Sequence, residues 1–306
     1  MKDDYILETD KLVKEFKGFV AVSEVSLKVR RGHIHALIGP NGAGKTTCFN
    51  LLSKFLEPTR GAIRFNGIDI TQEAPAQIAR RGIVRSFQIS AVFPHLTVLE
   101  NVRIALQRKL GGSFHFWRSD RLLSRLDGRA SELLAEVGLE AQAKMLAVEL
   151  PYGSKRALEI ATTLALEPEL MLLDEPTQGM GHEDVDRVMQ LIKKVSANRT
   201  ILMVEHNMKV VSGISDMITV LARGAVLAEG PYVEISAHPK VIEAYMGTEH
   251  EDDPPPGPRP TGGGDDGSSL WEPKAGSPEE VTDSMSKAAP ARGGPSPGAG
   301  ATGGRT

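Results

Sequence analysis

The chain has 306 residues, of which 41% are hydrophobic and 25% charged, and its formal net charge is −3. This length suffices for one large or two small domains with a substantial core. The charge balance provides no basic field for nucleic acid, and the single cysteine, Cys48, excludes an internal disulfide and fits a reducing compartment. Residues 1–5 show no signal pattern and no run of about 18 apolar residues occurs, so we expect a cytoplasmic protein that reaches a membrane only through a partner.

The composition changes near the C-terminal end. From Glu249 onward the residues are mainly Pro, Gly, Ser, Ala and acidic residues, and 10 of the 19 prolines follow residue 250. Such a segment cannot bury enough apolar surface to offset the entropy lost on ordering. We therefore expect one folded domain over residues 5–247 and a disordered tail over 248–306.

The first residues alternate between apolar and polar in two segments, Tyr5 to Val13 and Val20 to Val29, with Lys17-Gly18 between them. This pattern predicts two antiparallel strands joined by a turn. Phe16 precedes the turn. A lone phenylalanine usually joins a core, but its place upstream of a glycine-rich loop also allows it to stack on an adenine ring.

That loop fits the pattern G-x-x-x-x-G-K-[ST], follows an apolar run at Ile34 to Ile38 and precedes a helical pattern that continues to Phe55. Glycines let the backbone approach phosphate oxygens, and a helix N-terminus adds positive potential. Lys45 supplies a charge for the β- and γ-phosphates, and Thr46 a hydroxyl for Mg²⁺. The predicted phosphate-binding residues are Gly39, Pro40, Asn41, Gly42, Ala43, Gly44, Lys45, Thr46 and Thr47.

The next elements are short. Ala62 to Gly67 reads as a strand that ends in an Asn-Gly turn, and Pro75 to Arg81 as a helix with proline in its first turn. Gly82 to Gln88 reads as a strand that places Gln88 at its carboxyl end, the edge at which parallel sheets bind ligands. Taken alone, Gln88 is better explained as an ordinary loop amide.

A helical region of about residues 89–165 follows. Leu96 to Leu110 has helical spacing, and Thr97 and Glu100 form a capping box. Gly111 to Arg118 reads as an inserted loop before a second helix, Asp120 to Val137, which Gly138 ends.

A third helix begins after Leu150-Pro151 and runs to about Leu166. The backbone N–H groups of Tyr152, Gly153 and Ser154 lie in its first turn and could bind an anion. An ordinary helix start with a basic first turn explains the same pattern equally well.

Two further strands end on polar side chains. Leu170 to Leu173 is an apolar run followed by Asp174 and Glu175. Asp174 can share a Mg²⁺ ion with Thr46, and Glu175 can polarise the water that attacks the γ-phosphate. The strand Thr200 to Val204 leads to His206, whose imidazole can hydrogen-bond the γ-phosphate or that water.

The order of these motifs resembles the ATP-binding subunits of ABC transporters over residues 5–247. The resemblance identifies the Gly39 loop as Walker A, Leu150 to Ser154 as the signature and Leu170 to Glu175 as Walker B. It implies an α/β P-loop NTPase with a parallel-sheet core, an antiparallel β leaf and a helical subdomain. It also implies ATP and Mg²⁺ as ligands, with Phe16 against the adenine. The catalytic residues that it implies are Glu175, His206 and Gln88, and the metal ligands are Thr46, Gln88 and Asp174.

Within that family several stretches look like the subunits of branched-chain amino-acid uptake systems, including Phe93 to Val102, Val204 to Met208 and Val241 to Gly247. Lipopolysaccharide-export ATPases share features of the ending, and urea and amide uptake systems also remain open. The uptake resemblance implies a place on the cytoplasmic face of the bacterial inner membrane. The implied partners are permease subunits whose coupling helix docks near Gln88 to Pro94, a second cassette that is identical or a paralogue, and indirectly a periplasmic binding protein, but no nucleic acid.

Three residues depart from the family pattern. Pro151 stands where the signature has serine, Ser154 stands where it has glutamine, and Gly181 replaces an Asp or Asn before the helix at His182. Because these segments act on the partner's nucleotide, we hypothesise that the ATP site completed by this chain's signature is the weaker one. A regulatory cassette that binds ATP but hydrolyses little is the alternative.

Overall fold

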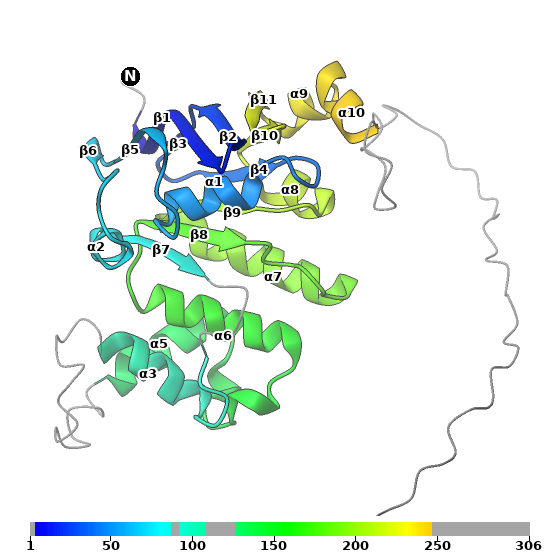
Figure 1. Ribbon diagram of the computed structural model, residues 1–306. Coiled ribbons are helices and arrows are strands. Elements are labelled where there is room, and N and C mark those ends of the chain that lie inside the picture. Colours follow the sequence, from blue (N-terminus) through cyan, green and yellow to red (C-terminus); the bar gives the residue numbers. More distant parts are fainter. Residues whose placement is uncertain (1–3, 87–91, 108–125, 247–306) are drawn as a thin grey trace, which may run out of the picture. The chain divides into compact units, whose positions relative to one another are not determined.

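The computed structural model describes residues 4–86, 92–107 and 126–246, all of them within the first of two compact units, Met1–Arg259 (Figure 1). The predictions for Gln88, for the inserted loop at 111–118 and for the tail at 248–306 lie outside the described residues. None of the helices in the described ranges is both long and apolar enough to cross a membrane.

The described chain begins with four strands, and strands and helices are mixed along the rest of it. The strands are β1 Tyr5–Phe16, β2 Phe19–Val25, β3 Lys28–Arg30, β4 Ile34–Ile38, β5 Arg60–Phe65, β6 Ile68–Asp69, β7 Ile83–Ser86, β8 Leu170–Asp174, β9 Thr200–Val204, β10 Met217–Ala222 and β11 Ala225–Gly230. The α-helices are α1 Lys45–Leu52, α2 Pro75–Arg81, α3 Val98–Gln107, α5 Asp127–Val137, α6 Tyr152–Leu164, α7 His182–Val195, α8 Met208–Ile214, α9 Tyr232–Ser236 and α10 Pro239–Met246. Short 3₁₀ turns occur at Glu140–Gln142, Ala147–Glu149 and Ser196–Asn198.

The central sheet has the strand order β11-β10-β4-β9-β8-β7, and its neighbours are parallel except for the antiparallel pair β10 and β11. Every residue of β4, β8 and β9 is buried, which is why these strands read as continuous apolar runs rather than alternating ones. The predicted parallel-sheet core is confirmed.

A second, antiparallel sheet has the order β2-β1-β5-β6, with β3 also paired to β1. Its turns are those that the sequence predicts: Lys17 and Gly18 have φ 46° and 91°, and Asn66 and Gly67 have φ 51° and 75°. The predicted single strand from Val20 to Val29 is wrong, because β2 ends at Val25 and β3 begins at Lys28. The two pieces pair with opposite halves of β1.

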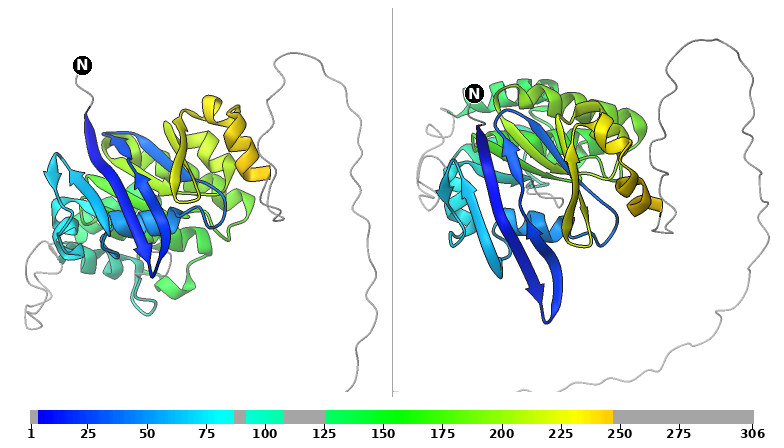
Figure 2. Two further views of the ribbon diagram at one scale, coloured as in Figure 1. Left: turned by 45° about the horizontal axis from the view of Figure 1, so that its top comes forward. Right: turned by 90° about the horizontal axis from the view of Figure 1, so that it is seen from above.

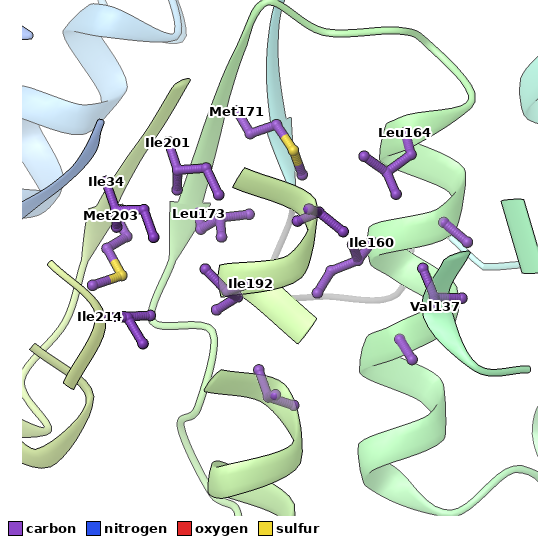
Figure 3. Close-up of a cluster of buried hydrophobic side chains, with 14 of the residues drawn as sticks. Ile34, Val137, Ile160, Leu164, Met171, Leu173, Ile192, Ile201, Met203 and Ile214 are labelled. Carbon is purple, nitrogen blue, oxygen red and sulfur yellow. The ribbon is translucent and has the colours of Figure 1, made fainter. Parts of the chain in front are cut away.

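The central sheet is covered on both faces (Figure 1). One face packs on α1 and the antiparallel sheet, and the other on α6, α7 and α8. Successive side chains of β8 divide accordingly, since Leu170 and Leu172 join the first cluster and Met171 and Leu173 the second. Figure 3 shows the second cluster, in which sheet residues meet Ile160 and Leu164 of α6. Each such fully buried side chain stabilises the fold by roughly 1.5–3 kcal/mol.

The helical region packs through α3, α5 and α6. The predicted capping box of α3 is confirmed: the Glu100 N–H donates to Thr97 Oγ1 at 3.2 Å, and the Thr97 N–H donates to Glu100 Oε2 at 2.8 Å. The predicted start of the next helix at Asp120 lies outside the described residues. The predicted helix from Asp120 to Val137 is not continuous, because Leu126 lies in a turn and α5 begins at Asp127. Its predicted end is right, with Gly138 at φ 75° as the C-cap.

Candidate functional site

Four neighbouring strands of the central sheet, β4, β9, β8 and β7, run parallel, so their carboxyl ends lie at one edge. The glycine loop follows β4, His206 follows β9, and Asp174 is the last residue of β8. In register, Asp174 lies opposite Val204, and Val204 opposite Leu37. The structure therefore places the loop, the carboxylate pair and the histidine side by side, whereas Gln88 lies outside the described residues.

The loop has the backbone that only glycine adopts without strain. Gly39 and Gly44 have φ 149° and 95°, and a Cβ on either would lie 2.1 Å from Leu221 O or 2.5 Å from Ala21 O. Gly44 precedes α1 directly, so the first N–H groups of α1 are presented toward the loop. This local geometry suits a bound phosphate group.

Lys45 is the first residue of α1 and lies half-buried over the loop. Its Nζ donates to Gly39 O at 2.6 Å and to Pro40 O at 3.0 Å. Burial lowers the pKa of Lys45 from its ordinary value, and the nearby Glu175 carboxylate partly opposes this shift. The lysine thus lies close to both the loop and the carboxylate pair. Its present partners are neutral carbonyl oxygens, over which an anionic phosphate would be preferred.

Glu175 occupies a constrained turn directly after β8. Its φ is 43°, a left-handed conformation that is uncommon for a residue with a side chain, and its N–H donates to Val204 O at 2.9 Å. Such conformations persist where the surrounding structure determines them, and they cluster at functional sites. The backbone therefore holds Glu175 at the end of the sheet beside β9.

Arg85 of β7 is a residue whose role the sequence patterns did not single out. Its guanidinium donates to Asp174 Oδ2 at 2.5 Å, to Asn50 Oδ1 at 2.6 Å and to Ser53 Oγ at 3.1 Å. The Arg85 and Asp174 side chains are only 13% and 6% exposed, so the ion pair is buried. Arg85 thereby fixes one oxygen of Asp174 and connects β8 to α1. An arginine inside an otherwise apolar strand was the available signal in the sequence.

Glu205 was likewise missed. It directly follows the buried strand β9, is 0% exposed, and accepts hydrogen bonds from Thr177, His206 and Asn207. A carboxylate directly after an apolar strand, next to a candidate histidine, was the signal that could have found it. His206 itself is exposed at the sheet edge.

The start of α6 carries the residues of the second candidate anion site. Tyr152, Gly153 and Ser154 form its first turn, and Pro151 is the N-cap residue without a side-chain hydrogen bond. Tyr152 is 58% exposed, and its hydroxyl donates to Gln178 O at 3.1 Å. Gly181, the N-cap residue of α7, also has no side-chain cap. This part of the chain therefore faces solvent with little side-chain support.

Phe16 lies at the tip of the β1–β2 hairpin, the dark blue strands whose tip extends beyond the neighbouring elements in the right view of Figure 2. Its ring is 41% exposed, with Lys14 Nζ 5.1 Å from the ring centre. Phe16 is therefore not a core residue, and its exposed side chain is accessible to a ligand.

A groove of about 440 Å³ separates β7 and α2 from the helical region. Its described lining includes Phe55, Ile78, Val84, Arg85, Ile104 and Thr162. Most of this lining is apolar. Arg85 reaches from this groove to Asp174, so the groove and the carboxylate share one side chain.

Comparison with known proteins connects these features to one family. Residues 22–178 match the family model described as ABC transporter, and residues 225–251 match the one described as branched-chain amino acid ATP-binding cassette transporter. The high-affinity branched-chain amino acid transport ATP-binding protein BraF of Pseudomonas aeruginosa is 41% identical over 252 residues, which are 79% of this chain and 98% of BraF.

Solved structures agree with the fold. The crystal structure of an ATP-binding cassette of an ABC transporter in its ADP conformation has a TM-score of 0.71 and 30% identity, covering 79% of this chain and 99% of that one. The dimeric structure of another ATP-binding cassette, in a post-hydrolysis state with ADP and Pi, has a TM-score of 0.61 and 26% identity, covering 74% and 98%.

Proposed function

The chain belongs to the ABC transporter family of ATP-binding cassettes, and we propose that it hydrolyses ATP to energise the uptake of branched-chain amino acids or related amino acids and amides. The observation that carries this proposal is the single sheet edge at which Lys45, the Asp174-Glu175 pair and His206 follow three adjacent parallel strands. P-loop nucleotide hydrolysis needs a phosphate cradle, a metal-ligating carboxylate and a group that orients water. This edge offers all three.

On this proposal the near side of the ATP site is built from this chain alone. The loop Gly39 to Thr47 binds the phosphates through its backbone N–H groups, and Lys45 exchanges its two carbonyl partners for the β- and γ-phosphates. Glu175 accepts a proton from the attacking water, and His206 donates a hydrogen bond to the γ-phosphate. Phe16 stacks on the adenine ring.

The donor set at the end of β8 also fits a magnesium ion. Thr46 is exposed and offers a hydroxyl, Asp174 accepts from Arg85 through Oδ2 and offers Oδ1 as a ligand, and Gln88 is a further proposed ligand. When bound, Mg²⁺ supplies positive charge that offsets the negative charge of the phosphates.

The far side of the site comes from a second cassette, which is identical or a paralogue. The dimeric relative bound to ADP and Pi supports this arrangement. At the N-terminus of α6, Tyr152 is exposed and Gly153 and Ser154 are half-buried, so this turn is accessible to a partner's nucleotide. ATP then joins two half-sites that are too weak to close by themselves.

The relatives support the proposed substrate class and location. The match of residues 225–251 to the branched-chain amino acid model supports uptake over lipopolysaccharide export. The cassette then acts on the cytoplasmic face of the bacterial inner membrane with permease subunits and, indirectly, a periplasmic binding protein. The groove lined by Phe55, Val84 and Ile104 is apolar and suits the permease coupling helix, which also meets the segment Gln88 to Pro94.

The decisive test compares ATP turnover of the purified chain with that of Glu175→Gln. Loss of a general base lowers the rate by roughly 10²–10⁴-fold. We expect a fall of that size with fluorescent ATP still bound, whereas Lys45→Ala should lose binding itself. Equal turnover in wild type and Glu175→Gln would contradict hydrolysis. Uptake of radiolabelled leucine by cells that lack this chain, complemented with either form, tests the substrate class.

Equal turnover would favour the second candidate, a regulatory cassette that binds ATP but hydrolyses little. The absence of a side-chain cap at both Pro151 and Gly181 motivates it. In that case ATP should still promote association of the cassettes without release of phosphate.

A further inference from the structure

Glu205 is a fully buried carboxylate whose hydrogen bonds go to two different loops. Its Oε1 accepts from the N–H and the hydroxyl of Thr177, at 3.1 and 2.6 Å. Its Oε2 accepts from the N–H groups of His206 and Asn207, at 3.1 and 3.2 Å. Each oxygen thus serves one loop, and this side chain joins the loop after β8 to the loop after β9.

Both loops carry residues of the proposed ATP site. Thr177 follows Glu175 by two residues, and His206 follows Glu205 directly. The next residue in the first loop, Gln178, accepts a hydrogen bond from Tyr152 at the start of α6. Hydrogen bonds, joined by the backbone between Thr177 and Gln178, therefore lead from His206 through Glu205 to the signature helix.

The burial of Glu205 makes this link stiff. A carboxylate away from water is costly unless its oxygens are hydrogen-bonded, and the bonds that satisfy a charge are the strong ones. If either loop moved alone, one Glu205 oxygen would lose both of its donors while remaining buried. The lower-energy motion shifts the two loops together.

We propose that Glu205 is a positioning residue that locks the His206 loop to the turn after Glu175, so that occupancy of this chain's own ATP site sets the position of its signature helix. The proposal rests on the proposed ATPase function. It gives Glu205 no contact with nucleotide: its effect is transmitted through His206 on one side and through Thr177 and Tyr152 on the other.

Four variants separate positioning from simple stability. Glu205→Gln keeps the size of the side chain but replaces one carboxylate oxygen by an NH₂ group. This group cannot accept a hydrogen bond from either loop. Thr177→Val removes the hydroxyl donor, whereas Thr177→Ser restores it. Glu229→Gln is the control, because it alters a similar bond, Thr219 Oγ1 to Glu229 Oε2 at 2.8 Å, away from both loops.

We expect kcat to fall about 100-fold in Glu205→Gln and about tenfold in Thr177→Val, since small displacements of catalytic groups have effects of this size. KM for ATP should stay within about twofold, because the phosphate loop is unchanged. Thr177→Ser and Glu229→Gln should retain the wild-type kcat. An unchanged kcat in Glu205→Gln, or equal falls in Thr177→Val and Thr177→Ser, would overturn the proposal; the threonine pair decides if Glu205→Gln does not fold.

A second readout does not depend on hydrolysis. Adding ATP to the full chain should slow amide hydrogen exchange both at 205–208 and at 176–179 in the wild type, but only at 205–208 in Glu205→Gln. Equal slowing of both segments in the variant also refutes the link. If the wild type and Glu175→Gln hydrolyse ATP at the same rate, the proposed ATPase function is wrong. Hydrogen exchange would still decide whether Glu205 couples the two loops.

Discussion

The two halves of ATP chemistry in this chain are built very differently. The edge of the central sheet is supported by buried strands, a buried Arg85–Asp174 ion pair and the buried Glu205 carboxylate. The start of α6 has an uncapped Pro151 and a Tyr152 that is 58% exposed. The first region is organised within one chain. The second region is accessible to another chain, so its contribution to nucleotide binding depends on the chain that covers it.

This contrast suggests where mutations should act. Groups at the sheet edge are held by desolvated interactions, which are costly to break singly. Groups at the start of α6 are solvated, so that changes there should alter the partner's ATP site without unfolding the cassette.

Replacing Arg85 should have the largest effect on stability. Arg85→Met leaves the Asp174 carboxylate buried without its guanidinium partner, and breaking a buried pair from one side costs about 3–5 kcal/mol. Urea unfolding should show that loss. Arg81→Met, which removes the more exposed pair with Glu73, should have a much smaller effect. Equal losses for both arginines would show that the edge is not specially supported.

The stability of the folded protein should depend on pH through His35, which lies in β4. This side chain is 1% exposed and hydrogen-bonds Thr219 Oγ1 at 2.8 Å, and burial, followed by the charge of His33, lowers the pKa of His35 to about 4. As the pH falls, the unfolded chain binds this proton before the folded chain does. Stability is therefore lost between about pH 6.5 and 4, by about 3 kcal/mol.

Between pH 7 and pH 4, the unfolding free energy of His35→Gln should fall by about 3 kcal/mol less than that of the wild type. Other titrating groups are common to both proteins, so the difference reports His35. His182→Gln, at an exposed position, should follow the wild-type curve. If His35→Gln also follows it, His35 takes up its proton without cost in the folded state.

Pro151→Ser should strengthen the α6 region. Serine at the N-cap supplies an oxygen for a free N–H of the first turn, worth roughly 1 kcal/mol, and a hydroxyl toward the partner's nucleotide. We expect about fivefold faster hydrolysis at the site that this signature completes, measured site by site in the assembled transporter. Equal rates at the two sites of the wild-type assembly would contradict the hypothesis that Pro151 weakens one of them.

The smallest expected effect is that of Tyr152→Phe. It removes the exposed hydrogen bond to Gln178 O, worth about 0.5–1 kcal/mol, and leaves the ring in place. The melting temperature should stay within a few degrees of the wild-type value, while hydrolysis at the partner's site should fall about two- to threefold. A lower rate of hydrolysis at this chain's own ATP site, and not at the partner's, would contradict a role for Tyr152 in the signature.

The sequence determined most of the framework because its signals are local. The glycine loop, the Asn66-Gly67 turn, the capping box at Thr97 and the buried strand before Asp174 each follow from backbone conformations or periodicities that a few neighbouring residues impose. The motifs also predicted that the candidate ATP-site residues meet at one edge of the sheet, since parallel strands put their carboxyl ends together. The prediction of one strand from Val20 to Val29 failed because the division depends on pairing with the irregular β1 and not on local alternation.

Tertiary structure decided which side chains support those motifs. Arg85 and Asp174 are 89 residues apart and Glu205 and Thr177 are 28 apart, so no local pattern could pair them. The strand order brings each pair together, and burial then makes each polar contact strong, because water no longer competes for it. The sequence thus specified the groups that we propose to meet the nucleotide, while only the fold specified the buried polar side chains that hold them.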